Sequence, residues 1–230
     1  RDLHSFPTRR SSDLEIRLVL GCKNTTILEG IACIGENAFM GCEGLSEINI
    51  PSTVSEIDEF AFSGCSGLTS ITIPSNVIKI EEGAFAYCSG LKTIQVSPSN
   101  PVYNSQDNCN AIISTNSNKL VTGCSNTVIP EGVTTIAGYA FSASKDLTSI
   151  VIPASVTYIG PLAFCLCENL TSLELPSSVN YIGDLAFAAC YNLNQINIPS
   201  GVKQIGTATF QDCYNLTSLF LPSTVESIGN

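Results

Sequence analysis

The sequence contains no tryptophan, one methionine and a single histidine, His4, close to the start of the chain. Beyond it no imidazole can serve as a general base, so Ser/His/Asp and Cys/His nucleophilic systems are excluded. Basic residues are also scarce, with 10 Lys and Arg against 20 Asp and Glu. Because these cations are scattered, the chain lacks the clustered basic face that nucleic acid requires. Binding to an anionic membrane surface is disfavoured for the same reason.

Long apolar runs are missing as well, since none reaches the length of about 18 residues that is typical of a membrane span. The first fourteen residues also lack the apolar stretch and cleavage site of a signal peptide. They resemble the in-frame translation of a sequencing adapter, and we interpret residues 1–14 as a disordered assembly artefact. A genuine disordered arm is the alternative. Because the sequence begins in this segment and stops within a repeat, we expect it to be truncated at both ends.

The chain does contain an internal repeat, with a period of about 23 residues that lies in the range of leucine-rich solenoids. Its unit reads Ile-Pro-x-x-Val-x-x-Ile-x-x-x-Ala-Phe-x-x-Cys-x-x-Leu-x-x-Ile-x. In such solenoids each repeat is one coil of a stack. The period is marked by Pro51, Pro74, Pro130, Pro153, Pro176, Pro199 and Pro222.

One repeat predicts two extended stretches and a short helix. Leu68, Ile71 and Ile73 alternate with polar residues as in a half-buried strand, which Pro74 ends. A second extended stretch follows, and the Ala-Phe-x-x-Cys string has the spacing of one helical face. The position before each leucine holds residue types that tolerate a left-handed φ, so we expect it to end this helix. Those residues are Gly44, Gly67, Gly90, Asp146, Asn169, Asn192 and Asn215.

We therefore predict an α/β repeat fold: a leucine-rich-repeat solenoid with a parallel β-sheet and short helical turns, formed by residues 15–230 as a single unit. An imperfect first coil covers residues 27–49, further coils cover residues 50–95 and 129–220, and another begins at Leu221. Residues 96–128 form an insert, which we interpret as a hairpin or irregular excursion, since it is too small for its own core. We expect its deletion to leave the fold intact.

The cysteines form a column rather than a metal site. Six of the eleven occupy one repeat position, where parallel side chains disfavour disulfides and favour buried reduced thiols. Outside the column, a disulfide between Cys109 and Cys124 remains an alternative. With no histidine and only Cys165 near Cys167, we predict no metal and no cofactor. The column consists of Cys42, Cys65, Cys88, Cys167, Cys190 and Cys213.

Acidic groups show no catalytic pattern. Carboxylate pairs such as Asp58 with Glu59 lie at variable positions of a coil and are expected to be surface charge. Asp107, Asn108 and Asn110 in the insert could ligate calcium, but their spacing matches no calcium loop and favours a polar turn. We identify no catalytic residue.

The outward positions of the first strand of each coil should form a continuous polar ribbon. It either binds an extended partner or is merely a solvated face. Tyr158 with Tyr181, and Tyr191 with Tyr214, are one period apart and should stack. The candidate ligand-binding residues are Glu47, Asn49, Ser70, Thr72, Thr93, Gln95, Ser149, Val151, Ser172, Glu174, Gln195, Asn197, Ser218 and Phe220.

The repeat closely resembles the BspA-type leucine-rich repeat family over residues 27–230, although Ser144 and Thr209 replace the usual cysteine and alanine. This resemblance implies a cell-surface or secreted protein that adheres to protein ligands such as host extracellular-matrix or other surface proteins. We thus expect a non-enzymatic recognition module with protein partners, no nucleic acid and no direct membrane insertion. The alternative is a spacer that displays a catalytic or adhesive domain lying outside this chain.

Overall fold

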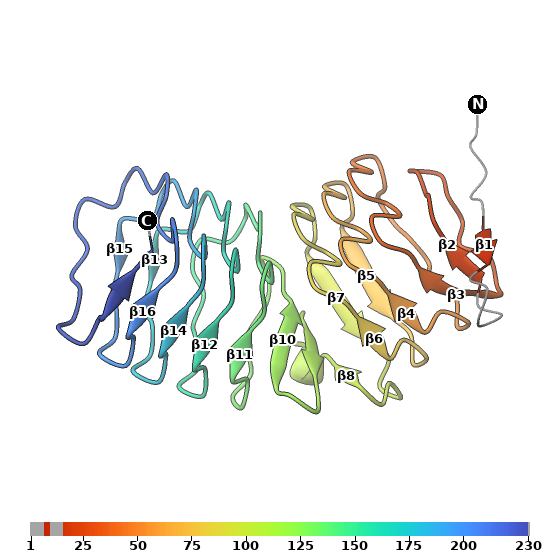
Figure 1. Ribbon diagram of the computed structural model, residues 1–230. Helices are drawn as coiled ribbons and strands as arrows, with labels where there is room; N and C mark the ends of the chain where they lie inside the picture. Colours follow the sequence, from red (N-terminus) through yellow and green to blue (C-terminus); the bar gives the residue numbers. More distant parts are fainter. Residues whose placement is uncertain (1–6, 10–15, 230) are drawn as a thin grey trace.

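The computed structural model describes residues 7–9 and 16–229, in which coils stand side by side in one row (Figure 1). The row follows the sequence, from the red coils at low residue numbers to the blue coils at high ones. Within these described residues the only helix is a 3-10 turn, η1 (Gln106–Asn108). The molecule is therefore a β-solenoid, and the α/β expectation with a short helix in every coil is wrong.

The second extended stretch of the coils forms the longer of the two strand systems. Neighbouring coils pair in parallel one period apart, as at Glu56 with Lys79 and at Tyr158 with Tyr181. One sheet has five strands: β1 (Pro7–Arg9), β2 (Ile16–Leu18), β3 (Ile31–Ile34), β4 (Glu56–Ile57) and β6 (Lys79–Ile80). The other has eight: β8 (Tyr103–Asn104), β9 (Ile112–Ser114), β10 (Lys119–Thr122), β11 (Thr135–Ile136), β12 (Tyr158–Ile159), β14 (Tyr181–Ile182), β16 (Gln204–Ile205) and β17 (Ser227–Ile228).

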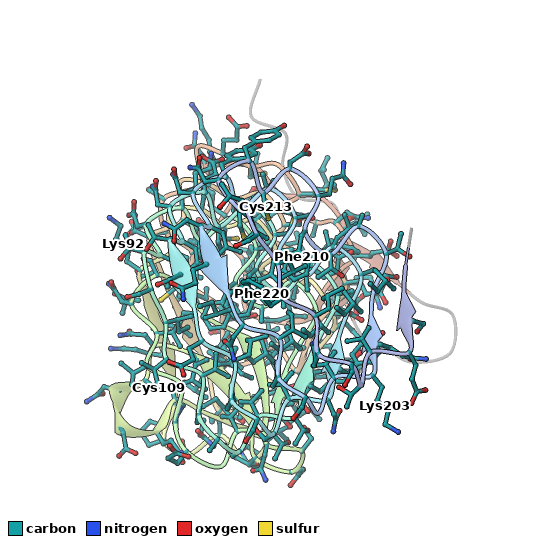
Figure 2. The ribbon with its side chains drawn as sticks, turned by 90° about the vertical axis from the view of Figure 1, so that its left-hand side faces the viewer. Lys92, Cys109, Lys203, Phe210, Cys213 and Phe220 are labelled. Atoms are coloured by element: carbon teal, nitrogen blue, oxygen red, sulfur yellow. The ribbon has the colours of Figure 1, made fainter. Side chains whose placement is uncertain are left out.

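The first extended stretch forms two short parallel sheets on the other side of the coils. These are β5 (Ser70–Ile73) with β7 (Thr93–Val96), and β13 (Ser172–Leu173) with β15 (Gln195–Ile196). Exposed and buried residues alternate strictly along β5 and β7, as the sequence predicts. Figure 2 views the row from its C-terminal end, with Lys92 and Lys203 on opposite edges of the cross-section. Lys92 precedes β7 and Lys203 precedes β16, so the two strand systems face away from each other.

Turns replace the expected helix around each Ala-Phe-x-x-Cys string. Leu162 and Leu166, which precede the alanine and the cysteine of one coil, have φ values of 54° and 60°. The backbone N–H groups of Leu162, Phe164 and Leu166 donate to carbonyl groups of the next coil at 2.8 to 2.9 Å. In a helix these N–H groups would donate along the helix axis to carbonyl groups of the same coil. Here they donate to the next coil instead, so the segment forms turns although its apolar side chains have helical spacing.

The residue before each leucine does not take the left-handed conformation that we expected. None of the seven positions is among the positive-φ residues, so that prediction is wrong. At position 67 glycine is required for a steric reason instead, because a Cβ atom there would lie 2.3 Å from the Glu43 carbonyl oxygen. At the asparagine positions the side chain bonds to the preceding coil. The Asn192 amide donates to the Glu168 carbonyl at 2.9 Å, and Asn215 donates to Asn192 Oδ1 at 3.1 Å.

Columns of identical side chains fill the interior. Phe39, Phe62 and Phe85 form one column, with ring centroids 4.9 and 5.3 Å apart and nearly parallel planes. A second column runs from Phe141 to Phe210 through the phenylalanines of the two coils between them, with centroids 5.0 to 5.7 Å apart. All these rings are buried except that of Phe210, which is half-buried. This dry stack confirms the solenoid that the repeat predicts.

The insert forms part of the solenoid wall and of its interior. Strands β9 and β10 form the expected hairpin, and β10 pairs in parallel with β11 as a coil strand would. Tyr103 and Ile112 pack in the core of the preceding coils, whereas Ile113 and Leu120 pack in that of the following coils. From this packing we expect deletion of residues 96–128 to expose both cores and to destabilise the fold, contrary to the expectation from the sequence.

The segment interpreted as an adapter lies mostly outside the described residues. Its described part, β1, pairs antiparallel with β2 in the register Pro7 with Leu18.

Candidate binding surface

The ribbon of outward side chains exists as one exposed face. All fourteen candidate residues are exposed: Glu47, Asn49, Ser70, Thr72, Thr93, Gln95, Ser149, Val151, Ser172, Glu174, Gln195, Asn197, Ser218 and Phe220. Their strands are joined from coil to coil by backbone hydrogen bonds, such as Lys92 N–H to the Thr69 carbonyl at 2.9 Å. The structure thus brings the candidate residues together on one side of the molecule.

Residues that sequence reasoning missed extend this ribbon across the insert. Asn126 and Val128 are exposed, and they lie one period before Ser149 and Val151. The Asn126 side-chain amide donates to the Lys92 carbonyl at 3.2 Å, which ties the insert to the coil before it. A step of one period back from Val151 leads to Val128, which lies at the end of the segment 96–128 that departs from the repeat motif. The ribbon hereafter means the fourteen candidate residues together with Asn126 and Val128.

Two aliphatic side chains stand out on this polar face. Val128 is 71% exposed and Val151 is 83% exposed, and they occupy adjacent coils at the same ribbon position. These valines do not contribute to the core, and they present apolar surface that a partner can cover. Phe220 lies further along the same row and is 84% exposed.

Two grooves run along the ribbon. The larger, of about 680 Å³, lies over the first coils and is bordered by Lys23, Glu47, Asn49, Ser70 and Thr72. The smaller, of about 350 Å³, is lined by Ser172, Leu173, Glu174, Gln195 and Asn197. Both are polar and offer hydrogen-bonding side chains to an extended ligand.

Asn197 is less available than its exposure suggests. Its side-chain Oδ1 accepts a hydrogen bond from the Leu175 N–H at 2.7 Å, and its Nδ2 donates to the Leu175 carbonyl at 2.9 Å. The amide therefore pairs with the neighbouring backbone as a peptide group would. Gln195 and Glu174 are the better candidates for contact with a ligand in this groove.

Ion pairs border the ribbon on both sides of the insert. Lys92 Nζ lies 3.0 Å from Asp146 Oδ2 and thus connects the coils that flank the insert. Lys145 Nζ lies 2.9 Å from Glu168 Oε1 in the next two coils. These groups are largely exposed, so each pair contributes only about 0–1 kcal/mol to stability.

The paired tyrosines stack as predicted. The ring centroids of Tyr158 and Tyr181 are 4.6 Å apart, and those of Tyr191 and Tyr214 are 5.6 Å apart, both with nearly parallel planes. Tyr158 and Tyr181 begin strands β12 and β14, on the face opposite to the ribbon. The stacking is what ladder packing predicts, and Tyr214 at the end of its pair remains 73% exposed.

Five of the six column cysteines are buried hydrogen-bond donors, whereas Cys42 is half-buried and its Sγ lies 3.6 Å from the Gly21 carbonyl oxygen. Cys65 Sγ lies 3.1 Å from the Phe39 carbonyl oxygen, and Cys88 lies 3.1 Å from that of Phe62. Burial raises the pKa of Cys65 to about 12. The column thiols are therefore protonated near neutral pH and are poor nucleophiles. The same contact with the phenylalanine of the preceding coil recurs at Cys167, Cys190 and Cys213.

Cys109 and Cys124 are both buried free thiols in the structure. Cys109 packs in the core of the following coils and Cys124 in the core of the preceding ones. Cys124 Sγ lies 3.6 Å from the Asn110 carbonyl oxygen. The insert is thus held by packing and hydrogen bonds in this structure.

Solved structures show the same architecture. A leucine-rich cell surface protein of Faecalibacterium prausnitzii is 29% identical, with a TM-score of 0.65 over 89% of this chain and 58% of its own. The pneumococcal vaccine antigen PcpA is 23% identical, with a TM-score of 0.67 over 87% of this chain and 45% of its own. The chain thus spans about half the length of these proteins. A comparison with curated proteins gives no match.

The described residues include no helix that is long and apolar enough to cross a membrane. The family model for the BspA-type leucine-rich repeat region matches residues 20–122 and 111–230 in six copies. It describes a repeat region rather than a catalytic family. This match covers most of the chain and agrees with the coil geometry. The chain belongs to the BspA-type leucine-rich repeat family.

Proposed function

We propose that this chain is a non-enzymatic recognition and adhesion module that acts at a bacterial cell surface or after secretion. Its partners are proteins, such as host extracellular-matrix or other surface proteins, and they bind along the ribbon. The observation that carries this proposal is the exposed pair Val128 and Val151 at the centre of a continuous polar face. The similarity to a cell surface protein of Faecalibacterium prausnitzii supports the location.

The ribbon suits an extended partner because its contacts are many and individually weak. Short polar side chains such as Ser70, Thr93 and Ser172 present hydroxyl groups at the spacing of the coils, about 4.8 Å. The valine pair supplies the apolar centre that a polar rim surrounds in protein interfaces. Affinity then depends on the number of coils that the partner spans, as in other solenoids.

The test measures binding of the purified chain to a panel of immobilised host extracellular-matrix proteins. Replacement of both valines, Val128→Glu with Val151→Glu, should weaken binding at least about tenfold, or about 1.4 kcal/mol, because two charges would enter the apolar centre. The matched control is Ile78→Glu, since Ile78 is also an exposed aliphatic residue but precedes β6 on the opposite strand system.

Equal binding by the double variant and the chain itself would contradict the ribbon as the contact surface. No binding to any protein of the panel would favour the alternative, in which the coils are a spacer that displays another domain. That alternative has one specific observation in its favour, because the similar cell surface protein extends beyond the matched region.

A further inference from the structure

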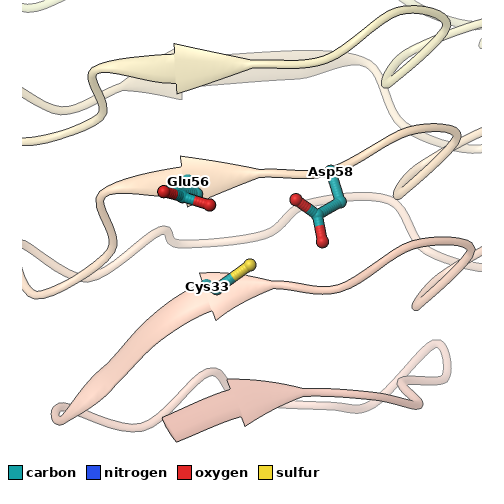
Figure 3. A group of neighbouring side chains, drawn as sticks. All are labelled: Cys33, Glu56 and Asp58. Atoms are coloured by element: carbon teal, nitrogen blue, oxygen red, sulfur yellow. The ribbon is translucent and has the colours of Figure 1, made fainter. Parts of the chain in front are cut away.

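Three metal-ligand side chains from two coils meet on the face opposite to the ribbon. Cys33 lies on β3, Glu56 lies directly opposite on β4, and Asp58 follows β4 immediately. Figure 3 shows the Cys33 sulfur and the Asp58 carboxylate directed toward each other across the gap between the two strands, with Glu56 beside them. The ladder register therefore creates this cluster from residues that lie about one period apart in the chain.

The geometry of the cluster suits one metal ion. The Cys33 Sγ atom and one carboxylate oxygen from each of Glu56 and Asp58 all lie within 4.8 Å of one another. Cys33 is only 2% exposed, whereas the two carboxylates are half-buried. An ion would reach the thiolate through the carboxylate side, and one ligand position would remain for water.

The surroundings of Cys33 differ from those of the column thiols. Each buried column thiol described above donates to the carbonyl of a phenylalanine. The Cys33 Sγ atom instead lies within 4.8 Å of a carboxylate oxygen of Asp58 and of one of Glu56. A buried thiol that faces two carboxylates has no packing role comparable to that of the column. The arrangement instead places a soft sulfur ligand atom beside two carboxylate oxygen ligand atoms.

The charges around the cluster leave ligand atoms available. Arg17 pairs with Asp58 through the Oδ2 atom, which leaves Oδ1 for an ion. Lys79 Nζ bonds Glu81 at 2.8 Å but lies 3.9 Å from Glu56, so its hold on Glu56 is weak. With a divalent ion, a thiolate, two carboxylates and the Arg17 guanidinium, the formal charges of the site sum to zero.

We propose that Cys33, Glu56 and Asp58 form a binding site for a thiophilic divalent transition-metal ion, with Zn²⁺ as the best fit. Thiolate and carboxylate are both accepted zinc ligands, and three protein ligands with water complete a tetrahedral set. On binding, the S–H bond of Cys33 breaks, a sulfur–metal bond forms and the proton passes to solvent. Arg17 then orients the Asp58 carboxylate from outside the coordination sphere. The ion would pin two adjacent coils together.

The test titrates the purified chain with Co²⁺ alone and records the sulfur-to-cobalt charge-transfer band in the near ultraviolet. We expect one equivalent of Co²⁺ to produce the band, Zn²⁺ to abolish it, and a large excess of Mg²⁺ to leave it unchanged, since Mg²⁺ prefers oxygen ligands. Cys33→Ser should remove the band. Glu56→Gln and Asp58→Asn should each weaken Co²⁺ binding at least about tenfold.

The matched control is Cys65→Ser, which removes a buried thiol from the same coil as Glu56 and Asp58 that faces a carbonyl instead of carboxylates. This variant should keep the full band. Glu56→Gln alters a half-buried side chain, so it remains informative if Cys33→Ser fails to fold. Absence of the band in the unmodified chain, its persistence in Cys33→Ser, or undiminished Co²⁺ affinity in Glu56→Gln would overturn the proposal.

Discussion

At the residue scale, the column cysteine combines two properties that no other side chain of its size offers. It is apolar enough for a dry interior, yet its S–H group donates to a backbone carbonyl at 3.1 to 3.2 Å in five equivalent contacts. Ser144 fits the same slot and is also buried. This position therefore accepts a small side chain that carries either a thiol or a hydroxyl group.

The first prediction concerns stability at alkaline pH. An unfolded cysteine ionises near pH 9, whereas burial raises the pKa of Cys65 to about 12 in the folded chain. Between these values only the unfolded state loses the proton. The free energy of unfolding should therefore be fully retained below pH 9 and should fall above it by about 1.4 kcal/mol per pH unit for this thiol.

Cys65→Ser should reduce this slope, because a hydroxyl group does not ionise in that range. Urea unfolding of the chain and the variant at pH 8 and pH 10 measures the difference. Equal slopes in the two proteins would show that Cys65 is not protected in the folded state.

Sequence reasoning predicted burial of these residues well but missed their hydrogen bonds. The identity of a column follows from the repeat alone, since the same residue type recurs at one position of every coil. The carbonyl that accepts each S–H comes from a residue 26 positions earlier, and its direction depends on turns that the pattern does not reveal. The cluster of Cys33, Glu56 and Asp58 was missed for a related reason, because it depends on the register between two coils.

At the element scale, the turns explain why the expected helix does not form. Ala-Phe-x-x-Cys has the spacing of one helical face, but the same three side chains also point inward from a chain of tight turns. Residues such as Phe60, Tyr139 and Leu185 occupy the left-handed region at φ values of 52° to 60°. Bulky residues avoid this conformation in isolation, at a cost of about 1–2 kcal/mol each. Hydrogen bonds to the next coil offset that cost, so local propensity misled the prediction.

The asparagine positions offer a prediction at this scale. The Asn192 side chain donates to the Glu168 carbonyl at 2.9 Å and accepts from Asn215 at 3.1 Å, so it connects three coils. Asn192→Ala should lower the free energy of unfolding by about 1 kcal/mol, because it removes the side-chain hydrogen bonds to both neighbouring coils. Thermal or urea unfolding measures the loss.

Asn194 provides the control two residues away, since it is exposed and its backbone rather than its side chain bonds the preceding coil. Asn194→Ala should change stability by less than about 0.5 kcal/mol. An equal loss in both variants would mean that the ladder of side-chain amides adds nothing to the stacking of coils.

At the scale of the whole molecule, the repeat predicted the solenoid, its period and its buried columns, because these follow from nearest-neighbour stacking. It did not predict how residues 96–128 join the stack. That segment departs from the motif, and its strands pair antiparallel before β10 rejoins the parallel ladder. The ribbon was predicted in position, whereas its continuation through Asn126 and Val128 depends on this rejoining.

Because each coil contacts only its neighbours, a destabilising core substitution should affect only the coils close to it. Phe39 stacks on Phe62 at one end of the first column, so Phe39→Ala should leave a cavity and cost about 3–5 kcal/mol there. Hydrogen exchange followed by mass spectrometry should then show faster exchange in β3 and β4 and unchanged exchange in β14 and β16.

Phe187→Ala is the matched variant in the second column and should give the opposite pattern. Uniformly faster exchange along the chain in either variant would show that the coils unfold as one cooperative unit.

The constant step of one period between paired strands has a consequence for the history of such genes. Recombination that adds or removes one complete period gives every remaining coil a neighbour of the same kind, so the product can still fold. A change of any other length within a regular coil would bring polar side chains into the phenylalanine column, whereas residues 96–128 rejoin the ladder through their own hairpin. Unequal crossing-over can therefore lengthen or shorten the protein in whole coils, and with it the reach of the surface that it presents.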